Sequence, residues 1–217
     1  MAESIKNQVD ALTGFGSTED LALQDWCEAG VKELISIFPS KLKEKCSTVT
    51  NLYIGNTNTT MDMDGCGEIL YATRENADSG YYAPCRKISS MYGDMSNDSS
   101  NLMYYATETD PVYWIESNSS GASTLFIKPT PTSLQPAKIY HIAYPLVNIA
   151  SSEIGNFPDE AEYLVTLYAA IKATERRMLD EEDMEVFGPQ LQTLKQDYQQ
   201  GIQMLIGQGA TPSKGGK

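Results

Sequence analysis

The segment from Phe157 to Met178 carries the strongest structural pattern in the chain. Its apolar residues recur at intervals of three and four, which places them on one face of an α-helix. These residues are Ala161, Leu164, Val165, Tyr168 and Ile171. Such a face must be buried, and Ala169, Ala170 and Ala173 leave room for a neighbouring helix. We therefore predict a packing helix without a catalytic constellation, around which the rest of the chain is organised.

Two stretches nearer the N-terminus also show helical periodicity. Ile5, Val9 and Leu12 predict a short helix. Ser17 is expected to cap a second helix, because an acidic residue follows three positions later. The apolar stripe of this second helix ends before Pro39 and consists of Leu23, Trp26, Cys27, Gly30, Leu34 and Phe38. Within the stripe, Trp26 is expected to be a core residue rather than a platform for a ligand.

The C-terminal part of the chain contains a further helical pattern. Gly188 and Pro189 predict a break between helices after an acidic run. Apolar residues then recur at nearly heptad spacing, at Leu191, Leu194, Tyr198, Ile202 and Leu205. Two helices joined by a short break predict an antiparallel pair.

The middle of the chain has a different character. From about Val49, β-branched and aromatic residues are frequent, and Asn, Ser, Asp, Gly and Pro interrupt them every few residues. This pattern predicts short strands at residues 48–54, 68–74, 84–90, 102–107, 112–117, 124–128 and 139–144. The clearest hairpin joins residues 112–117 to residues 124–128 through the turn residues 118–121 (NSSG). Because no helical periodicity separates these strands, an antiparallel sheet or a small barrel is favoured.

Together these elements predict an α+β fold. Residues 1–47 and 148–206 are expected to form one helical domain from the N- and C-terminal helices. Residues 48–147 are expected to form an inserted antiparallel β-rich domain. Residues 207–217 contain almost no apolar side chains and are expected to be a flexible C-terminal tail.

The charge of the chain bears on its partners. The formal net charge is −13 and the sequence pI is about 4.4. Nucleic-acid binding needs clustered Lys and Arg, so we expect DNA to pass such a surface without specific binding. A tight oligomer of so acidic a chain would need specific, shape-complementary contacts.

The four cysteines are widely spaced and form no C-x-x-C pair, which argues against a zinc knuckle or a thioredoxin-like site. They are Cys27, Cys46, Cys66 and Cys85, and we expect them to be reduced thiols with a structural role. The sequence shows neither a leader peptide nor a membrane span, so we expect synthesis in the cytoplasm and no membrane partner.

Three features suggest chemistry, and each has a simpler structural interpretation. Asp62, Asp64 and Gly65 match the third, fifth and sixth positions of a calcium loop, but Tyr71 stands where a bidentate Glu is needed. His141 is the only histidine and has no nucleophile motif beside it. The adjacent carboxylates of residues 181–183 point apart on a helix. We therefore expect no catalytic residues, no bound metal and no other cofactor.

The order of the segments resembles a known protein family. The most informative pieces are residues 110–114 (DPVYW), residues 128–131 (KPTP) and residues 158–161 (PDEA). From about residue 17 to residue 206, the chain resembles the head-to-tail adaptor proteins of tailed bacteriophages, also called connector or neck proteins. The resemblance implies a structural virion protein that forms a ring, commonly of twelve copies, beneath the portal protein.

Such a ring connects the portal to the tail around a DNA channel. The resemblance therefore implies as partners the portal protein, a tail-tube, nozzle or other tail protein, and further copies of this chain. It places the protein in the virion, at the interface of head and tail. The C-terminal tail is expected to order only on contact with the portal, through Gly207, Thr211, Pro212, Lys214 and Lys217. The alternative is a terminus without a role.

Two other functions are compatible with the sequence. The first is a tail-associated carbohydrate-binding or hydrolytic module, in which strand aromatics such as Tyr81, Tyr82 and Trp114 line a cleft. A hydrolase would need converging carboxylates, and nothing in the sequence brings together two of Glu68, Glu108, Asp110 and Glu116. The second is another ring subunit of the neck or tail.

Overall fold

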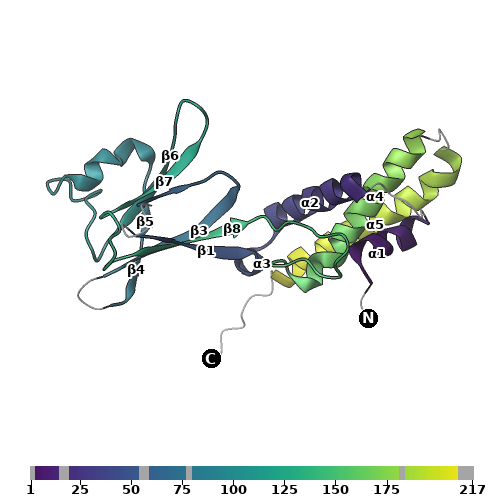
Figure 1. Cartoon of the computed structure of the whole chain (residues 1–217), viewed down its shortest axis with the longest axis horizontal. Helices are drawn as coiled ribbons and strands as arrows, with labels where there is room; N and C mark the ends of the chain where they lie inside the picture. The colour runs from purple at the N-terminus through teal and green to yellow at the C-terminus, as the bar shows by residue number, and fades with distance from the viewer. Residues whose placement is uncertain (1–2, 15–19, 54–58, 77–79, 181–183, 210–217) are drawn as a thin grey trace. The chain divides into compact units, whose positions relative to one another are not determined.

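The computed structural model describes residues 3–14, 20–53, 59–76, 80–180 and 184–209. The chain divides into two compact units, which we describe separately. The helical unit comprises Met1–Cys46 and Tyr144–Lys217, and the strand unit comprises Ser47–Ala143. Figure 1 shows helices from both ends of the chain in the first unit and β-strands in the second. The α+β fold predicted from the sequence is confirmed.

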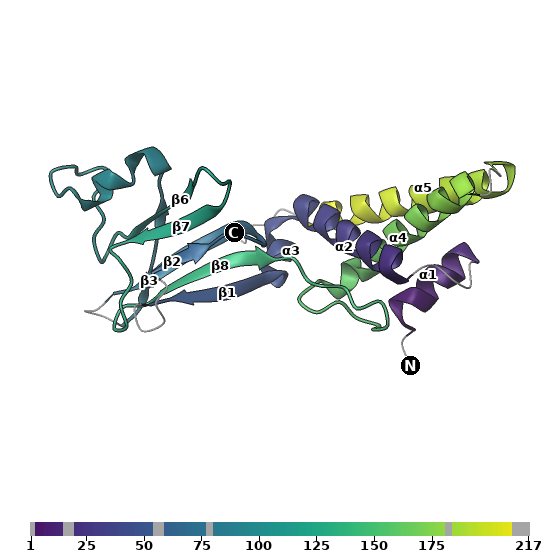
Figure 2. The ribbon, with the colours of Figure 1, turned by 45° about the horizontal axis from the view of Figure 1, so that its top comes forward.

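The helices of the helical unit are arranged around one of them. In chain order they are α1 (Ile5–Thr13), α2 (Asp20–Ile37), α3 (Ser40–Lys45), α4 (Asp159–Asp180) and α5 (Met184–Gly209). Helix α4 contacts α1, α2 and α5, and Figures 1 and 2 show these three helices along it. The run from Leu164 to Leu167 is buried without interruption, so α4 is covered on most of its sides.

Two glycines allow α2 and α5 to approach α4 closely. A Cβ atom at Gly30 of α2 would lie 2.9 Å from Cδ1 of Tyr168. A Cβ atom at Gly201 of α5 would lie 2.5 Å from Oη of Tyr163. The rings of Tyr168 and Tyr198 pack with their centroids 5.9 Å apart. The same stretch of α4 therefore receives both neighbouring helices.

The core of the helical unit differs in two places from the predicted one. Leu34, Leu164 and Leu194 are buried as expected, but Trp26 and Tyr168 are only half-buried. On α2 the fully buried residues are Leu23, Cys27, Val31, Leu34 and, at 2% exposure, Ile35. The buried face of α2 is centred near Val31, and Trp26 lies at the edge of this face.

On α1 the buried residues are Ile5, Val9 and Thr13, whereas Leu12 is 38% exposed. The prediction for the last residue of the apolar face is therefore wrong, because Thr13 is buried in place of Leu12. Leu12 borders the groove described below.

Helix α5 corrects two predictions about the C-terminal region. The expected break at Gly188 and Pro189 is wrong, because α5 begins at Met184 and continues through both residues. A proline here removes one backbone hydrogen bond in the second turn, which the helix tolerates. The helix also continues past Ile206, so Gly207 is helical. The predicted cap at Ser17 lies outside the described residues.

The strand unit contains two four-stranded sheets. The strands of the first are β1 (Ser47–Leu52), β3 (Cys66–Glu75), β4 (Tyr82–Pro84) and β8 (Ala137–Ala143), in the order β1-β8-β3-β4. The strands of the second are β2 (Thr60–Asp62), β5 (Arg86–Lys87), β6 (Val112–Ser117) and β7 (Ser123–Lys128), in the order β2-β7-β6-β5. All pairings are antiparallel except that of β5 with β6.

Each sheet contributes to a shared core. The buried side chains come from strands of both sheets, and they are Leu52, Met61, Ala72, Tyr113, Leu125, Ile127, Ala137 and Ile139. The predicted hairpin of β6 and β7 is confirmed. Its turn uses the carboxamide of Asn118, whose Oδ1 accepts hydrogen bonds from the backbone N–H groups of Ser120 and Ala122, each at 3.0 Å.

The segment between β5 and β6 is the main difference from the predicted strands. The strand expected at residues 102–107 is wrong, because these residues form turns and loop backbone. Two short 3₁₀-helices precede them, η2 (Ser90–Tyr92) and η3 (Asp94–Asn97). The ring of Tyr104 stacks on that of Tyr92 with centroids 4.2 Å apart, so its aromatic side chain serves local packing instead of a strand ladder. Strand β2 was not predicted.

The close approach at Gly30 leads to a first prediction. Gly30→Ala should lower the free energy of unfolding by about 1–3 kcal/mol, because the new methyl group overlaps the half-buried ring of Tyr168. Urea denaturation of the purified chain measures this change.

Gly188→Ala is the matched control, since a Cβ atom there meets nothing within 4 Å in helix α5. That substitution should raise the stability by about 0.5–1 kcal/mol through helix propensity. Equal effects of the two substitutions would contradict the packing of α2 on α4.

Candidate functional site

The predicted portal-contacting residues lie at the C-terminal end of the chain. Gly207 is exposed in the last turns of α5. Thr211, Pro212, Lys214 and Lys217 lie outside the described residues, as do the three adjacent carboxylates of residues 181–183. The contact of the tail with a portal therefore stays a prediction.

The residues that resemble a calcium loop form a tight turn between β2 and β3. Oδ1 of Asp62 accepts a hydrogen bond from the backbone N–H of Asp64 at 3.0 Å, and Gly65 has a φ of 73°. This is an Asx turn followed by a left-handed glycine. Across the part of the chain that the structure describes, no three His, Cys, Asp or Glu side chains lie close enough together to hold a metal ion.

His141 is buried in β8, and both of its ring nitrogens have partners. Nε2 lies 3.0 Å from Oγ1 of Thr50, and Nδ1 lies 3.2 Å from the carbonyl oxygen of Ile142. Such bonding favours the structural interpretation of this histidine over the catalytic one.

The four thiols differ in their surroundings. Burial raises the pKa of Cys27 to about 12, that of Cys85 to about 12 and that of Cys46 to about 11. Burial also raises the pKa of Cys66, and the carboxylates of Asp62 and Asp64 raise it further. All four are free thiols in the structure.

A second prediction concerns the reactivity of these thiols. At pH 8 the native chain should react with a disulfide reagent first at Cys66, because Cys27 and Cys46 are buried and burial raises the pKa of the half-buried Cys85 thiol to about 12. The other thiols should react fully only in denaturant. Mass spectrometry of the modified peptides gives the order, and Cys66→Ser should abolish the fast phase. A fast reaction at Cys27 would contradict the packing of α2.

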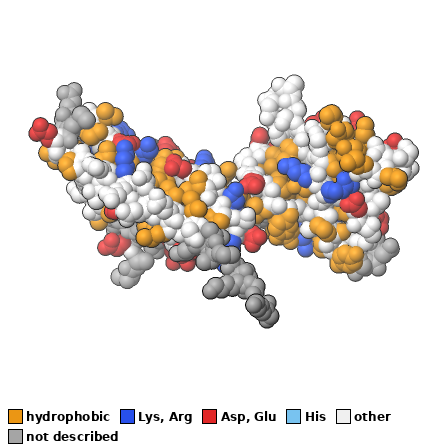
Figure 3. Space-filling model, turned by 180° about the vertical axis from the view of Figure 1, so that it is seen from behind, with side chains coloured by type: hydrophobic (Ala, Val, Ile, Leu, Met, Phe, Trp, Pro, Cys, Tyr) orange, Lys and Arg blue, Asp and Glu red, His pale blue; other side chains and the backbone are white. Residues whose placement is uncertain are grey.

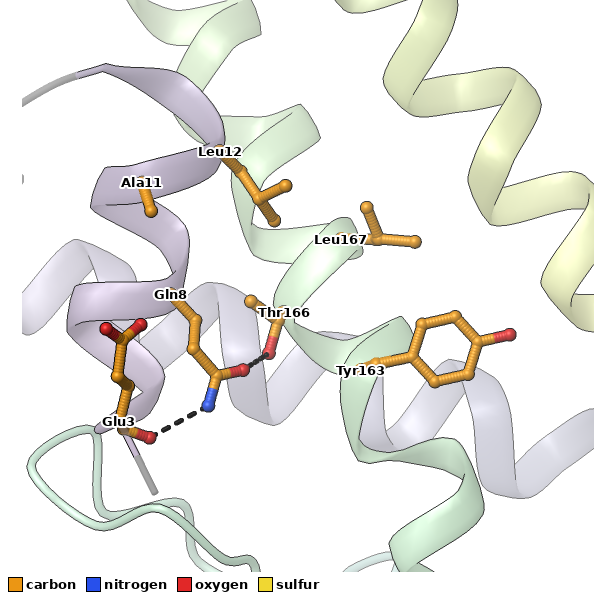
Figure 4. A pocket seen from close by; sticks show the side chains of 7 residues that line it. All are labelled: Glu3, Gln8, Ala11, Leu12, Tyr163, Thr166 and Leu167. Carbon is orange, nitrogen blue, oxygen red and sulfur yellow. Dashed lines mark hydrogen bonds between the residues drawn. The ribbon is translucent and has the colours of Figure 1, made fainter. Parts of the chain in front are cut away.

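A groove of about 340 Å³ lies between α1 and α4 in the helical unit. Its lining residues are Glu3, Gln8, Ala11, Leu12, Tyr163, Thr166 and Leu167. Figure 4 shows the amide of Gln8 between two partners: its Nε2 donates to the carbonyl oxygen of Glu3 at 2.8 Å, and its Oε1 accepts from Oγ1 of Thr166 at 3.3 Å. Leu12 and Tyr163 are 38% and 46% exposed. The groove thus offers mainly apolar walls to a visiting side chain.

The first sheet of the strand unit carries aromatic side chains on one face. Tyr71 and Tyr140 are directly opposite in register, and their rings stack with centroids 4.2 Å apart. Nearby, Nζ of Lys138 lies 3.9 Å from the ring centroid of Tyr82. Tyr71 is 46% exposed. A flat aromatic surface of this kind suits either a sugar ring or a protein partner.

A buried arginine, which the sequence did not single out, connects three parts of the strand unit. Arg74 of β3 is 1% exposed, and its Nη2 donates to Oε1 of Gln135 at 2.6 Å. Nε2 of Gln135 donates in turn to Oε1 of Glu108 at 3.1 Å. Burial lowers the pKa of the Arg74 guanidinium, which the carboxylate of Glu108 partly offsets.

Two of the carboxylates considered for hydrolysis therefore have structural partners. Glu108 belongs to this relay, and Oδ2 of Asp110 lies 2.9 Å from Nη2 of Arg86. Both carboxylates are engaged by polar side chains of the strand unit.

Both units expose large apolar side chains. In the helical unit the exposed ones include Leu12, Tyr163, Leu179, Val186, Met204 and Ile206, and in the strand unit they include Val49, Tyr71, Tyr81, Met91, Leu102, Met103 and Leu134. Figure 3 shows hydrophobic side chains gathered in several places on one face of the molecule. None of the described helices is both long and apolar enough to cross a membrane.

No protein-family model matches the chain, and no curated protein is significantly similar to it in sequence.

Proposed function

We propose that this protein is a structural component of a tailed-phage virion, a head-to-tail adaptor that assembles as a ring beneath the portal and connects it to the tail. A ring of twelve copies is the stoichiometry that the resemblance implies. The partners are the portal protein, a tail-tube, nozzle or other tail protein, and the neighbouring copies in the ring. DNA passes through the channel without specific binding, because the subunit is strongly acidic.

The observation that carries the proposal is the exposure of large apolar side chains on an acidic chain. The net charge of −13 opposes non-specific association, yet the α1–α4 groove and the outer residues of α5 expose Leu12, Tyr163 and Met204. Exposed apolar surface of this kind is typical of proteins that are covered by partners in an assembly. A ring subunit needs such contacts with its neighbours and with the proteins above and below it.

The pieces of sequence that carry the resemblance each lie at the boundary of an element. Residues 110–114 lead into β6, residues 128–131 start at the last residue of β7, and residues 158–161 contain the first residues of α4. Such boundaries determine the connections of the fold rather than the composition of its surface.

The third prediction concerns the C-terminal tail. Because α5 continues to Gly209, truncation after this residue removes only residues 210–217 and should leave the melting temperature nearly unchanged. If the tail contacts the portal through Thr211, Pro212, Lys214 and Lys217, truncation should weaken portal binding about tenfold per subunit, or about 1.4 kcal/mol. Co-sedimentation with purified portal protein and thermal melting measure the two effects.

A chain that carries a Gly-Ser segment of equal length in place of residues 210–217 is the control. It should bind as weakly as the truncated chain if the tail makes side-chain contacts. Unchanged portal binding after truncation would assign the contact to the helical or strand unit. Electron microscopy of the full chain with and without portal tests the adaptor function itself, and a failure to form rings on the portal would reject it.

A second candidate function is binding of a carbohydrate, which the stacked pair of exposed Tyr71 and half-buried Tyr140 favours. Tyr71→Ala separates the two functions. It should abolish binding to a glycan array if the aromatic face is a sugar platform, and it should leave ring formation on the portal intact.

A further inference from the structure

Four large apolar side chains are exposed in the segment between β5 and β6. Met91, Met95, Leu102 and Met103 are exposed by 70%, 41%, 93% and 70%, and we refer to these four residues as the methionine surface. In Figure 3, hydrophobic side chains gather over the part of the strand unit that carries this segment. Methionine is flexible and polarisable, and it is frequent at surfaces that adapt to a protein partner.

Buried aromatic packing holds the segment against the second sheet. A Cβ atom at Gly93 would lie 2.7 Å from Cε2 of Trp114, so the backbone rests directly on the indole ring. Trp114 is 6% exposed and stacks on Phe126 with centroids 5.4 Å apart. The stacked rings of Tyr92 and Tyr104 lie immediately next in sequence to Met91 and Met103. Only glycine allows this approach at position 93.

Hydrogen bonds fix the backbone of the same segment. Nη1 of Arg86 donates to the carbonyl oxygen of Met103 at 3.0 Å, and the same guanidinium pairs with Asp110. The backbone N–H of Ala106 donates to the carbonyl oxygen of Ser96 at 3.0 Å. The methionine surface is therefore carried by a packed and hydrogen-bonded frame, and a partner would not have to order it first.

The charges around this surface indicate what kind of partner it fits. Residues 88–127 contain no Lys or Arg and five acidic residues, which are Asp94, Asp98, Glu108, Asp110 and Glu116. Two basic residues, Arg86 and Lys87, precede this stretch, and Arg86 forms an ion pair with Asp110. Asp94 and Asp98 lie within the segment itself. An anionic lipid surface would be repelled by these carboxylates. A second copy that docked through the same surface would place its own Asp94 and Asp98 against these carboxylates, which disfavours that occupant.

We propose that the methionine surface is the docking site for a different protein, whose complementary surface is an apolar cleft rimmed by Lys and Arg. The apolar side chains enter the cleft, and the basic rim faces Asp94 and Asp98. The inference does not depend on the adaptor function, because it rests on the exposure, support and charge of this segment alone.

A designed peptide pair provides the probe. One helical peptide has a leucine face flanked by lysines, and its counterpart has glutamates in place of the lysines. Isothermal titration of the full chain should show one bound lysine peptide and at least about tenfold weaker binding of the glutamate peptide. The variant Met91→Gln/Leu102→Gln/Met103→Gln should weaken the lysine peptide at least about tenfold. All of its changes are at exposed positions, so thermal melting should show an unchanged fold.

Two further variants separate the apolar from the electrostatic contribution. Asp94→Asn/Asp98→Asn should weaken binding severalfold and reduce its salt dependence, while Asn at position 98 can still accept the bonds from Ser100. Leu179→Gln/Met204→Gln is the matched control in the helical unit, where these residues are 75% and 64% exposed, and it should change binding less than about twofold.

Methionine oxidation locates the contact independently. Saturating lysine peptide should slow the conversion of Met91 and Met103 to the sulfoxide by peroxide and leave that of Met204 unchanged. The proposal is overturned if the triple variant binds normally, if both peptides bind equally, or if no binding occurs. It is also overturned if the triple variant abolishes self-association or binding to vesicles of phosphatidylcholine and phosphatidylglycerol, because the occupant would then be a second copy or a membrane.

Discussion

The packing of three helices on α4 is the constraint on which the helical unit depends. Neither α2 nor α5 has a side chain at the point of closest approach, since Gly30 faces Tyr168 and Gly201 faces Tyr163. Helix α4 is covered on most of its sides, and two of the helices that cover it, α1 and α2, come from the N-terminal part of the chain. The apolar groove beside α4 lies between α1 and α4, where Leu12 and Tyr163 stay partly exposed.

The sequence was informative where side-chain period and burial coincide. The face of α4 was predicted from its apolar spacing, and the β6–β7 hairpin from its turn residues. Prediction failed where the same residue type is common in two different structural positions. The apolar spacing of α2 cannot tell whether Trp26 lies at the centre or at the edge of the buried face. Pro189 indicates a helix end in the sequence, and only the start of α5 at Met184 shows that this proline lies in the second turn of a continuous helix. The stretch at residues 102–107 has the composition of a strand, but its tyrosine finds a stacking partner instead.

The candidate surfaces were the least predictable part. Met91 and Met103 are of a residue type that is usually buried, yet both are 70% exposed in the segment whose Gly93 packs on Trp114. Glu108 and Asp110 looked like free carboxylates in the sequence, whereas Gln135 and Arg86 engage them. The surroundings of these methionines and carboxylates depend on contacts between residues far apart in the chain, which local sequence patterns do not predict.

The insertion of the strand unit between α3 and α4 has a consequence for synthesis. On the ribosome α1 and α2 emerge first, but the helix they pack on follows the whole of Ser47–Ala143. The apolar face of α2, with Cys27, Val31 and Leu34, therefore stays exposed until α4 is synthesised, while the sheets form. The strand unit can form its own core before α4 is synthesised, so the chain is expected to fold from its middle outward. Until α4 is available, α1 and α2 are the part that a chaperone would need to protect.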